Sequence, residues 1–388
     1  MERRFFLRSL GMLGCSAAAH PWLTTLTMAQ GTPAMGDNRL VVIILRGAMD
    51  GLDVVQPRGD AGFLAARPGI SAPATDLDGF FALNDALSDL MPLWQAGELG
   101  VVHATSTPYR DKRSHFDGQD LLEAGTGIDV APGAGRDGWL NRLLQAVPGI
   151  TSETAYAVGR EALPILGGAA EVRNWAPDQK LVLSGPGRLL LDHVYHDDPL
   201  FRDTVEEAFA LTAGGDPMVS GRAEDVDMIV DFVAERLRGD TRIAAFSQSG
   251  WDTHKAQARA IKQPLARLQR TILRMKAQLG PEVWGKTTLL AMTEFGRTVR
   301  ENGTGGTDHG TGGVMLVAGG AVRGGRVMGR WPGLAEAGLY DRRDLMPTSD
   351  VRAWAAHAMR GLYGLDRGVL ESTVFPGLEM GDDPGFLL

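Results

Sequence analysis

Short apolar runs rich in β-branched residues alternate along this chain with longer stretches of helical periodicity. An apolar run of about four to eight residues indicates a strand that is buried on both faces of a sheet. The runs predict strands at Leu40–Leu45, Gly97–Ala104, Arg242–Ser247 and Thr287–Thr293, and a later pair at Val314–Ala318 and Gly325–Gly329 across the Gly-rich turn Gly319–Gly324. Helical spacing predicts helices at Leu83–Ala96, His115–Glu123, Ala223–Leu237, Ala256–Leu279 and Asp350–Leu362, the last behind Ser349 as its cap.

Strands that alternate with helices of this length predict an α/β fold, in which helices cover both faces of a mainly parallel sheet. We expect residues 38–380 to form one such domain. Residues 125–235 differ in pattern, because Gly/Pro clusters at Ala131–Gly138 and Thr212–Pro217 separate only a few helical stretches. We expect this region to be an insertion or cap on the domain.

Residues 1–29 have the features of an export signal. Arg3 and Arg4 precede the apolar stretch Leu10–Ala19, and small residues for cleavage follow at Thr27–Ala29. Paired arginines in this position indicate the Tat route, so we expect a periplasmic or secreted protein that the Tat machinery exports. Cleavage would remove Cys15, the only cysteine. An N-terminal amphipathic helix and a lipoprotein acylated at Cys15 are the alternatives.

Composition and charge narrow the possible partners. The chain has 388 residues, of which 44% are hydrophobic and 22% charged, as in ordinary folded proteins. Its formal net charge of −8 argues against a surface that binds nucleic acid. Beyond the N-terminus, no run of about 18 apolar residues predicts a membrane span.

Polar residues gather at the ends of the predicted strands, where the chemistry of an open α/β sheet is found. Asp50 and Asp53 follow the first predicted strand, and Arg113 and Ser114 follow the second. Asp252 and His254 follow the third strand, and Glu294 and Arg297 follow the fourth. A Gly-rich loop after them carries Asp308 and His309. Carboxylate and imidazole groups without cysteine suit Zn²⁺, Mn²⁺, Mg²⁺ or Ca²⁺. The aspartates and histidines of this set are therefore candidate ligands of a divalent ion.

Ser114 precedes a predicted helix, so its hydroxyl would lie among free backbone N–H groups at the positive helix end, which favours an anion such as phosphate. Arg46, Arg113 and Arg297 could add contacts to the oxygens of that anion. Each candidate also has a structural interpretation: turn caps for Asp50 and Asp53, helix caps for Ser114 and the segment 252–254, and a salt bridge between Glu294 and Arg297.

Several motifs together resemble an uncharacterised, Tat-exported family of unknown function that is related to alkaline phosphatases and sulfatases. They are LVVIILRGAMDGLD, PYRDKRSHFDGQD, GWDTH, TEFGRTVRENGTGGTDHG and GGAVRGGRVMGRWPGL, and the resemblance extends from about Arg39 to Pro376. It implies an alkaline-phosphatase-like, three-layer α/β/α fold in which two metal sites flank a Ser or Thr nucleophile.

By position, the resemblance gives the following roles: first-strand metal aspartate for Asp50 or Asp53, nucleophile for Ser114, an Asp/His ligand pair for Asp252 and His254, and the last metal histidine for His309. Glu294 and Phe295 stand where the superfamily has an Asp-His pair. This departure puts the second metal site in question, so the expected cofactor is one or two divalent ions.

The resulting prediction is an exported, metal-dependent hydrolase of phosphate or sulfate esters, whose substrate is a small molecule or a polymer. Ser114 would act with Arg297 and Glu294, and Arg46 and Arg113 would hold the substrate anion. The departure at Glu294 also favours an alternative, a non-catalytic binding protein on the same fold. A less favoured alternative is a serine esterase that uses Ser249, Glu294 and His309, which follow the α/β-hydrolase order.

Overall fold

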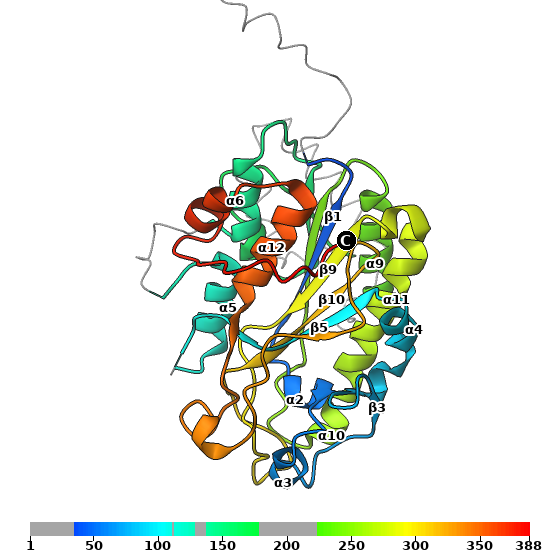
Figure 1. Cartoon of the computed structure of the whole chain (residues 1–388). Helices are drawn as coiled ribbons and strands as arrows, with labels where there is room; N and C mark the ends of the chain where they lie inside the picture. Colours follow the sequence, from blue (N-terminus) through cyan, green and yellow to red (C-terminus); the bar gives the residue numbers. More distant parts are fainter. Residues whose placement is uncertain (1–34, 111, 129–136, 178–222) are drawn as a thin grey trace, which may run out of the picture.

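A single central sheet dominates the computed structural model, which describes residues 35–110, 112–128, 137–177 and 223–388. Residues 1–29, predicted to be an export signal, lie outside the described residues. Within the described part, nine strands form the sheet in the order β11-β5-β10-β9-β1-β8-β6-β7, with β12 paired to β5 (Figure 1). The strands are β1 (Arg39–Leu45), β5 (Leu99–Ser106), β6 (Ala155–Val158), β7 (Arg173–Trp175), β8 (Ile243–Gln248), β9 (Thr287–Met292), β10 (Gly313–Ala318), β11 (Val327–Met328) and β12 (Ser349–Asp350).

The sheet is parallel except at one strand, which confirms the prediction of a mainly parallel sheet. Strand β1 pairs in parallel with β8 and with β9, and β6 pairs in parallel with β7 and β8. Strand β10 is antiparallel to both of its neighbours, β5 and β9. Its first residue therefore lies at the edge of the sheet where β1, β5, β8 and β9 end.

Two apolar layers cover the two faces of the sheet, so the three-layer α/β/α prediction is also confirmed. In β1, alternate residues face opposite ways: Val41, Ile43 and Leu45 pack on one side, and Val42 and Ile44 on the other. The first side is covered by α4 (Met91–Gln95), α9 (Ala223–Leu237) and α11 (Lys262–Trp284), and the second by α5 (His115–Ala124), α6 (Trp139–Ala146) and α12 (Val351–Tyr363).

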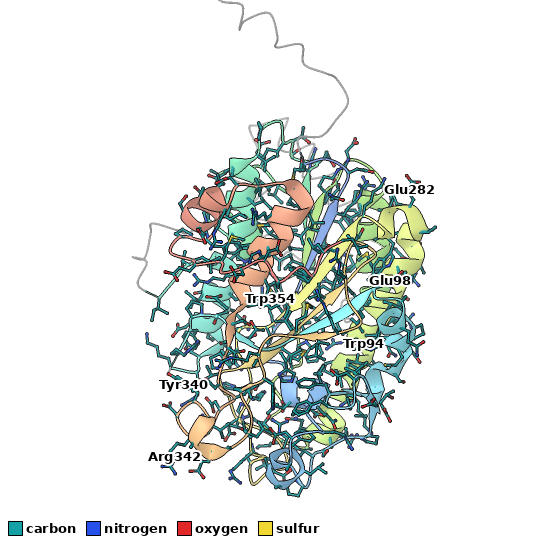
Figure 2. The ribbon with its side chains drawn as sticks, viewed as in Figure 1. Trp94, Glu98, Glu282, Tyr340, Arg342 and Trp354 are labelled. Atoms are coloured by element: carbon teal, nitrogen blue, oxygen red, sulfur yellow. The ribbon has the colours of Figure 1, made fainter. Side chains whose placement is uncertain are left out.

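Figure 2 shows the same division by side chain, with Trp354 on the α12 side and Trp94 on the α4 side. Full burial of an aliphatic or aromatic side chain stabilises a fold by roughly 1.5–3 kcal/mol. All seven residues of β1 are buried. The loop that follows β1 is therefore held at a fixed place by the core.

Smaller elements surround this core. They are α2 (Gly51–Val54), α3 (Gly62–Ala66), α10 (Gln257–Ala260), α13 (Arg367–Val369), 3₁₀ turns at Asp85–Leu90, Pro164–Leu166 and Glu336–Gly338, a π turn at Leu370–Val374, and a second sheet of β2 (Val55–Gln56), β3 (Ala74–Asp76) and β4 (Ala82–Asn84). Among the described helices, none is long and apolar enough to cross a membrane.

Three details of the predicted elements were wrong. Strands β10 and β11 are not neighbours, because β5 lies between them and pairs with both. The helix predicted at Leu83–Ala96 is instead a strand end, a 3₁₀ turn and the short helix α4. The cap of α12 is Asp350, whose side chain accepts from the Arg352 backbone N–H, and not Ser349.

The region predicted as an insertion, residues 125–235, contributes to the central layers where the structure describes it. Strands β6 and β7 extend the sheet beyond β8. Helix α6 packs on one face and α9 on the other. The division of the chain into a domain and a cap stays a prediction.

Candidate metal centre

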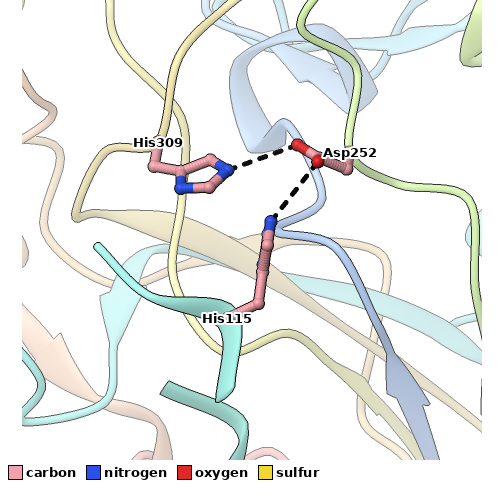
Figure 3. A group of neighbouring side chains, drawn as sticks. All are labelled: His115, Asp252 and His309. Carbon is pink, nitrogen blue, oxygen red and sulfur yellow. Dashed lines mark hydrogen bonds and ion pairs between the residues drawn. The ribbon is translucent and has the colours of Figure 1, made fainter. Parts of the chain in front are cut away.

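Four loops meet at the edge where the parallel strands end. They follow β1, β5, β8 and β9, and the last of them runs on through a Gly-rich segment into β10. Three side chains face one another there: His115 at the start of α5, Asp252 after β8 and His309 after β9 (Figure 3). One ligand atom from each lies within 4.8 Å of the other two.

Three imidazoles surround the carboxylate of Asp252. Its Oδ1 lies 3.0 Å from His254 Nε2 and 3.3 Å from His309 Nε2, and its Oδ2 lies 3.5 Å from His115 Nε2. His254 Nε2 and His309 Nε2 are themselves 2.9 Å apart. Neighbouring ligand atoms on one ion, each at ~2.0–2.2 Å from it, lie about 3 Å apart. The spacing of His115, Asp252 and His309 therefore fits one ion, and His254 lies beside them through its contacts with Asp252 and His309.

The second nitrogen of each imidazole has an acceptor of its own. His115 Nδ1 lies 2.8 Å from Glu294 Oε1, His309 Nδ1 lies 2.8 Å from the Arg113 carbonyl oxygen, and His254 Nδ1 lies 3.2 Å from Asp308 Oδ1. Carboxylate and carbonyl oxygens only accept, so each Nδ1 must carry the proton.

The neutral tautomer of all three rings then has an unprotonated Nε2. This leaves two nitrogen lone pairs facing each other at 2.9 Å, and a buried His115 Nε2 that makes no hydrogen bond in the described part of the chain. Arg297 Nη1 faces His254 Nε2 at 3.5 Å, and a proton or a metal ion between the two nitrogens would relieve the remaining repulsion. Imidazoles oriented through Nδ1 by carboxylates and carbonyls are typical of metal ligands.

Glu294 holds two parts of the site in place: the loop that follows β1, and the side chain of His115. Its Oε1 accepts from the backbone N–H groups of Gly47 and Ala48 at 2.9 and 3.1 Å, and from His115 Nδ1 and Gln119 Nε2 at 2.8 and 3.1 Å. The side chain is fully buried. Burial acts to raise the pKa of Glu294, but hydrogen bonds from His115, Gln119 and Thr293 outweigh it, so the pKa lies below the usual value.

Arg297 places a fixed positive charge beside Asp252. The guanidinium is buried and donates to the carbonyl oxygens of Ala48 and Thr307, both at 3.0 Å, and to Asp252 Oδ1. Partial burial acts to raise the pKa of Asp252, and the charge of Arg297 overcomes this and lowers it. Asp252, with 44% of its side chain exposed, is therefore an ionised carboxylate at the surface of the cluster.

Asp50 and Asp53, predicted as metal ligands, bond to a different set of side chains. Asp50 Oδ2 accepts from Arg67 Nη1 at 2.8 Å and from Gln257 Nε2 at 2.7 Å, and Asp50 Oδ1 caps α2. Asp53 accepts from Gln257 at 2.9 Å and from Asn84 at 3.0 Å. Burial and the negative charge of Asp50 raise the pKa of Asp53 to about 6.

Gln257 connects this buried network to the two loops that carry the cluster. Its Oε1 accepts from Thr253 Oγ1 at 2.9 Å and from Thr307 Oγ1 at 2.7 Å. Thr253 stands between Asp252 and His254, and Thr307 precedes the segment that ends in His309. The buried network thus fixes both loops through hydrogen bonds to Thr253 and Thr307.

Two glycines bring these loops together through the main chain. A Cβ on Gly306 would lie 2.4 Å from the carbonyl carbon of His254, and a Cβ on Gly310 would lie 2.4 Å from the carbonyl carbon of Arg297. Neither distance is possible between real atoms, so a side chain at either position would push the loops apart.

The predicted nucleophile and anion-binding residues lie near the cluster. Ser114 caps α5, where its Oγ accepts from the Asp117 N–H, and it directly precedes His115. Arg113 faces the carboxylates of Asp344 and Asp341 at 3.5 and 3.6 Å. Arg46 faces two other acidic side chains, Glu123 at 2.8 Å and Glu161 at 3.1 Å.

The structure thus brings Asp252, His254 and His309 together, with Asp308 and Glu294 behind them, and adds His115, which was not among the predicted ligands. His115 was identified as part of the motif PYRDKRSHFDGQD and as the first residue of a helix, without a role as a ligand. Its position after the second predicted strand, beside Ser114, was the available signal. The order Ser249, Glu294, His309 is not assembled as an esterase triad, because in the described residues Glu294 bonds to His115 and His309 bonds to Arg113.

A family model described as "Protein of unknown function (DUF1501)" matches residues 217–366, which confirms the expected resemblance over that part of the chain. The search of curated proteins found no match.

Solved structures similar to this chain include a protein in the alkaline phosphatase superfamily from Vibrio parahaemolyticus, with 14% identity, 91% of this chain and 74% of that chain covered, and a TM-score of 0.42. The lipoteichoic acid synthase LtaP from Listeria monocytogenes has 7% identity, coverage of 90% and 78%, and a TM-score of 0.42. The PsFucS1 sulfatase from Pseudoalteromonas sp. has 13% identity, coverage of 90% and 73%, and a TM-score of 0.39. At these values the likeness carries no inference about activity.

Proposed function

We propose that this chain is a metal-dependent hydrolase of phosphate or sulfate esters whose ion is held by His115, Asp252, His254 and His309. One observation carries the proposal: three imidazoles, each with Nδ1 on its own acceptor, direct Nε2 at a single carboxylate. Such an arrangement is costly without a cation between the nitrogens and is favourable with one.

The donor set favours one ion, and zinc over the harder cations. Three imidazole nitrogens and one carboxylate oxygen suit Zn²⁺, whereas Mg²⁺, Ca²⁺ and Mn²⁺ favour oxygen ligands. Asp50 and Asp53 would be the natural ligands of a second ion. Their oxygens already accept from Arg67, Gln257 and Asn84, which supports a single ion.

When bound, the ion would supply Lewis-acid stabilisation of the negative charge on the reacting ester. In this proposal, Ser114 is the nucleophile, because its hydroxyl lies at the N-terminus of the ten-residue helix α5, directly before a ligand. The positive end of α5 favours the anionic ester. Glu294 acts by positioning His115 and the loop after β1, since its carboxylate is buried and fully engaged by donors.

We further propose that the protein is exported by the Tat route through residues 1–29 and acts in the periplasm or outside the cell. Folding before export would allow the ion to be acquired in the cytoplasm. The substrate is a small-molecule or polymeric ester.

The test is the metal content of the full-length protein, with and without reconstitution, beside the double variant Asp252→Ala/His309→Ala. We expect about one equivalent of zinc, lost in the double variant. His357→Gln is the matched control, because His357 contacts the Met380 carbonyl oxygen and Asp383, which are not part of the cluster, and the variant should keep the metal. A wild-type protein that binds no metal would refute the proposal.

Hydrolysis separates the proposed enzyme from a binding protein on the same fold. Phosphate and sulfate esters are offered to the metal-loaded wild type and to Ser114→Ala. Turnover that is lost in Ser114→Ala supports the hydrolase. Bound metal without turnover of either ester class would leave the binding protein as the better account.

A further inference from the structure

Two arginines share one fully buried carboxylate next to the candidate metal centre. Asp344 has a side-chain exposure of 0%, and its Oδ2 lies 3.0 Å from Thr311 Oγ1 and 3.5 Å from Arg113 Nη2. Its Oδ1 faces Arg343 Nη1 at 3.3 Å. Arg113 and Arg343 therefore reach the same carboxylate through different oxygens.

This cluster adjoins the metal centre through the main chain. The carbonyl oxygen of Arg113 accepts from His309 Nδ1 at 2.8 Å, and Thr311 is two residues after His309. The guanidinium of Arg110 also lies over the Tyr340 ring, 5.9 Å from its centroid. The loop after β5 and the turn at residues 340–344 are thus packed together beside the ligands; Tyr340 and Arg342 mark this turn in Figure 2.

In the part of the chain that the structure describes, the guanidinium groups of Arg113 and Arg343 have N–H donors without an acceptor. Within the described residues, Arg113 Nε, Arg343 Nη1 and Asp344 Oδ1 are buried atoms that make no hydrogen bond, although the charges face each other. Arg67 is the contrast, since it bonds through Nε to Val299 at 2.9 Å, through Nη1 to Asp50 at 2.8 Å and through Nη2 to Thr298 at 2.6 Å. Arg113 Nε and Arg343 Nη1 are themselves buried, and the other N–H groups belong to side chains that are 31% and 36% exposed.

The backbone around these arginines is held in an unusual conformation. Arg113, Asp341 and Arg342 all have φ between 50° and 54°, a region that residues with a side chain rarely adopt. Such positions persist where the surroundings fix them, and they concentrate at binding and catalytic sites. With this conformation, the backbone carbonyl oxygen of Arg113 accepts from His309 Nδ1, and the Arg113 side chain faces the carboxylate of Asp344.

We propose that Arg113 and Arg343 form a second anion subsite beside the metal centre, which binds an additional phosphate or sulfate group of the substrate. Asp344 positions the two guanidinium groups, and their remaining N–H donors bind the oxygens of that group. Asp341, which is 58% exposed and 3.6 Å from Arg113, is a solvated partner that an incoming anion replaces. The inference rests on the proposed function and narrows its substrate to esters with more than one tetrahedral anionic group.

The first test measures anion binding to the metal-free, full-length protein by calorimetry, with inorganic phosphate and inorganic sulfate as separate probes. Arg343→Gln and Arg113→Gln should each weaken binding roughly tenfold to a hundredfold, the effect of losing hydrogen bonds to a charged group. Stronger binding of one probe identifies the preferred anion.

Arg342→Gln is the matched control. It removes the same charge from the neighbouring position, but Arg342 is 78% exposed and pairs with Glu336. Binding should change less than twofold in this variant. An equal loss in Arg342→Gln and Arg343→Gln would overturn the subsite, because general electrostatic attraction would then account for binding.

The second test uses the metal-loaded protein with benzenesulfonate and benzene-1,3-disulfonate, stable probes that differ by one sulfonate. The wild type should bind the disulfonate more tightly, and Arg343→Gln should abolish that advantage. An advantage that survives in Arg343→Gln would overturn the subsite. If Arg343→Gln does not fold, Arg343→Lys replaces it and should lose part of the advantage, since lysine keeps the charge without the planar fork.

The two proposals fail in different ways. A protein that binds no metal but loses anion binding in Arg343→Gln would refute the metallohydrolase and retain the anion subsite. A protein that binds metal and hydrolyses esters, with anion binding unchanged in Arg113→Gln and Arg343→Gln, would refute the subsite alone.

Discussion

Glu294 offers the most informative single perturbation, because one buried oxygen receives four donors. Glu294→Ala leaves the backbone N–H groups of Gly47 and Ala48 buried without an acceptor. Each such group costs about 1–3 kcal/mol, so we expect the free energy of unfolding to fall by roughly 2–6 kcal/mol. Urea denaturation monitored by tryptophan fluorescence measures this change.

Glu294→Gln tests the charge with little change of shape. The amide oxygen can keep the place of Oε1, and the amide nitrogen then faces Thr293 Oγ1, which lies 2.9 Å from Oε2 and donates to the Leu45 carbonyl oxygen. We therefore expect less than half the destabilisation caused by alanine. Metal affinity should still fall about tenfold to a hundredfold, because His115 loses its carboxylate partner.

Competition with a chromophoric chelator measures that affinity. A folded Glu294→Gln protein with wild-type affinity for zinc would refute the assignment of His115 as a ligand oriented by Glu294. Wild-type stability of Glu294→Ala would refute the role of this carboxylate in fixing the loop after β1.

Three further changes test the buried network and the loops. Arg67→Leu leaves Asp50 buried without its cationic partner and should cost about 3–5 kcal/mol in urea denaturation at neutral pH; a loss below about 1 kcal/mol would contradict the pairing. Asp53 binds its proton more tightly in the folded state, with a pKa of about 6 against 3.8, so its contribution to stability is present below about pH 4 and is lost as the pH rises through 6. Asp53→Asn should therefore gain up to about 3 kcal/mol relative to wild type between pH 4 and pH 7, and parallel stability profiles would exclude this assignment. Gly306→Ala should weaken zinc binding at least tenfold by displacing the His254 carbonyl, with the same chelator competition as readout, and unchanged affinity would show that the loops tolerate the added Cβ.

The hydrophobic pattern predicted the centre of the sheet well because buried parallel strands carry a continuous apolar run of four or more residues. Strands β1, β8 and β9 are cases of this kind. The direction of β10 was not predictable, since an apolar run looks the same whether its neighbours are parallel or antiparallel. Strand β11 has only two residues, so its partner depends on distant contacts and not on its own sequence.

For the candidate site, too, local sequence features were predictable and contacts between distant residues were not. Polar residues at strand ends could be identified from the sequence, and the convergence of Asp252, His254 and His309 follows from the parallel topology. Which carboxylates bond elsewhere could not be predicted, because the partners are remote: Asp50 bonds to Gln257, and Glu294 to His115. Those contacts join positions 207 and 179 residues apart in the chain.

The close main-chain contacts at Gly306 and Gly310 distinguish substitutions that would move the loops from substitutions that would change only exposed side chains. There the metal-centre loops are packed main chain against main chain, so their geometry depends on the lack of side chains. Arg113 and Arg343, by contrast, belong to the proposed anion subsite through long, partly exposed side chains. A substitution at Gly306 or Gly310 is therefore expected to displace the loops themselves. A substitution in the proposed subsite would change its contacts with an anion and leave that main-chain packing in place.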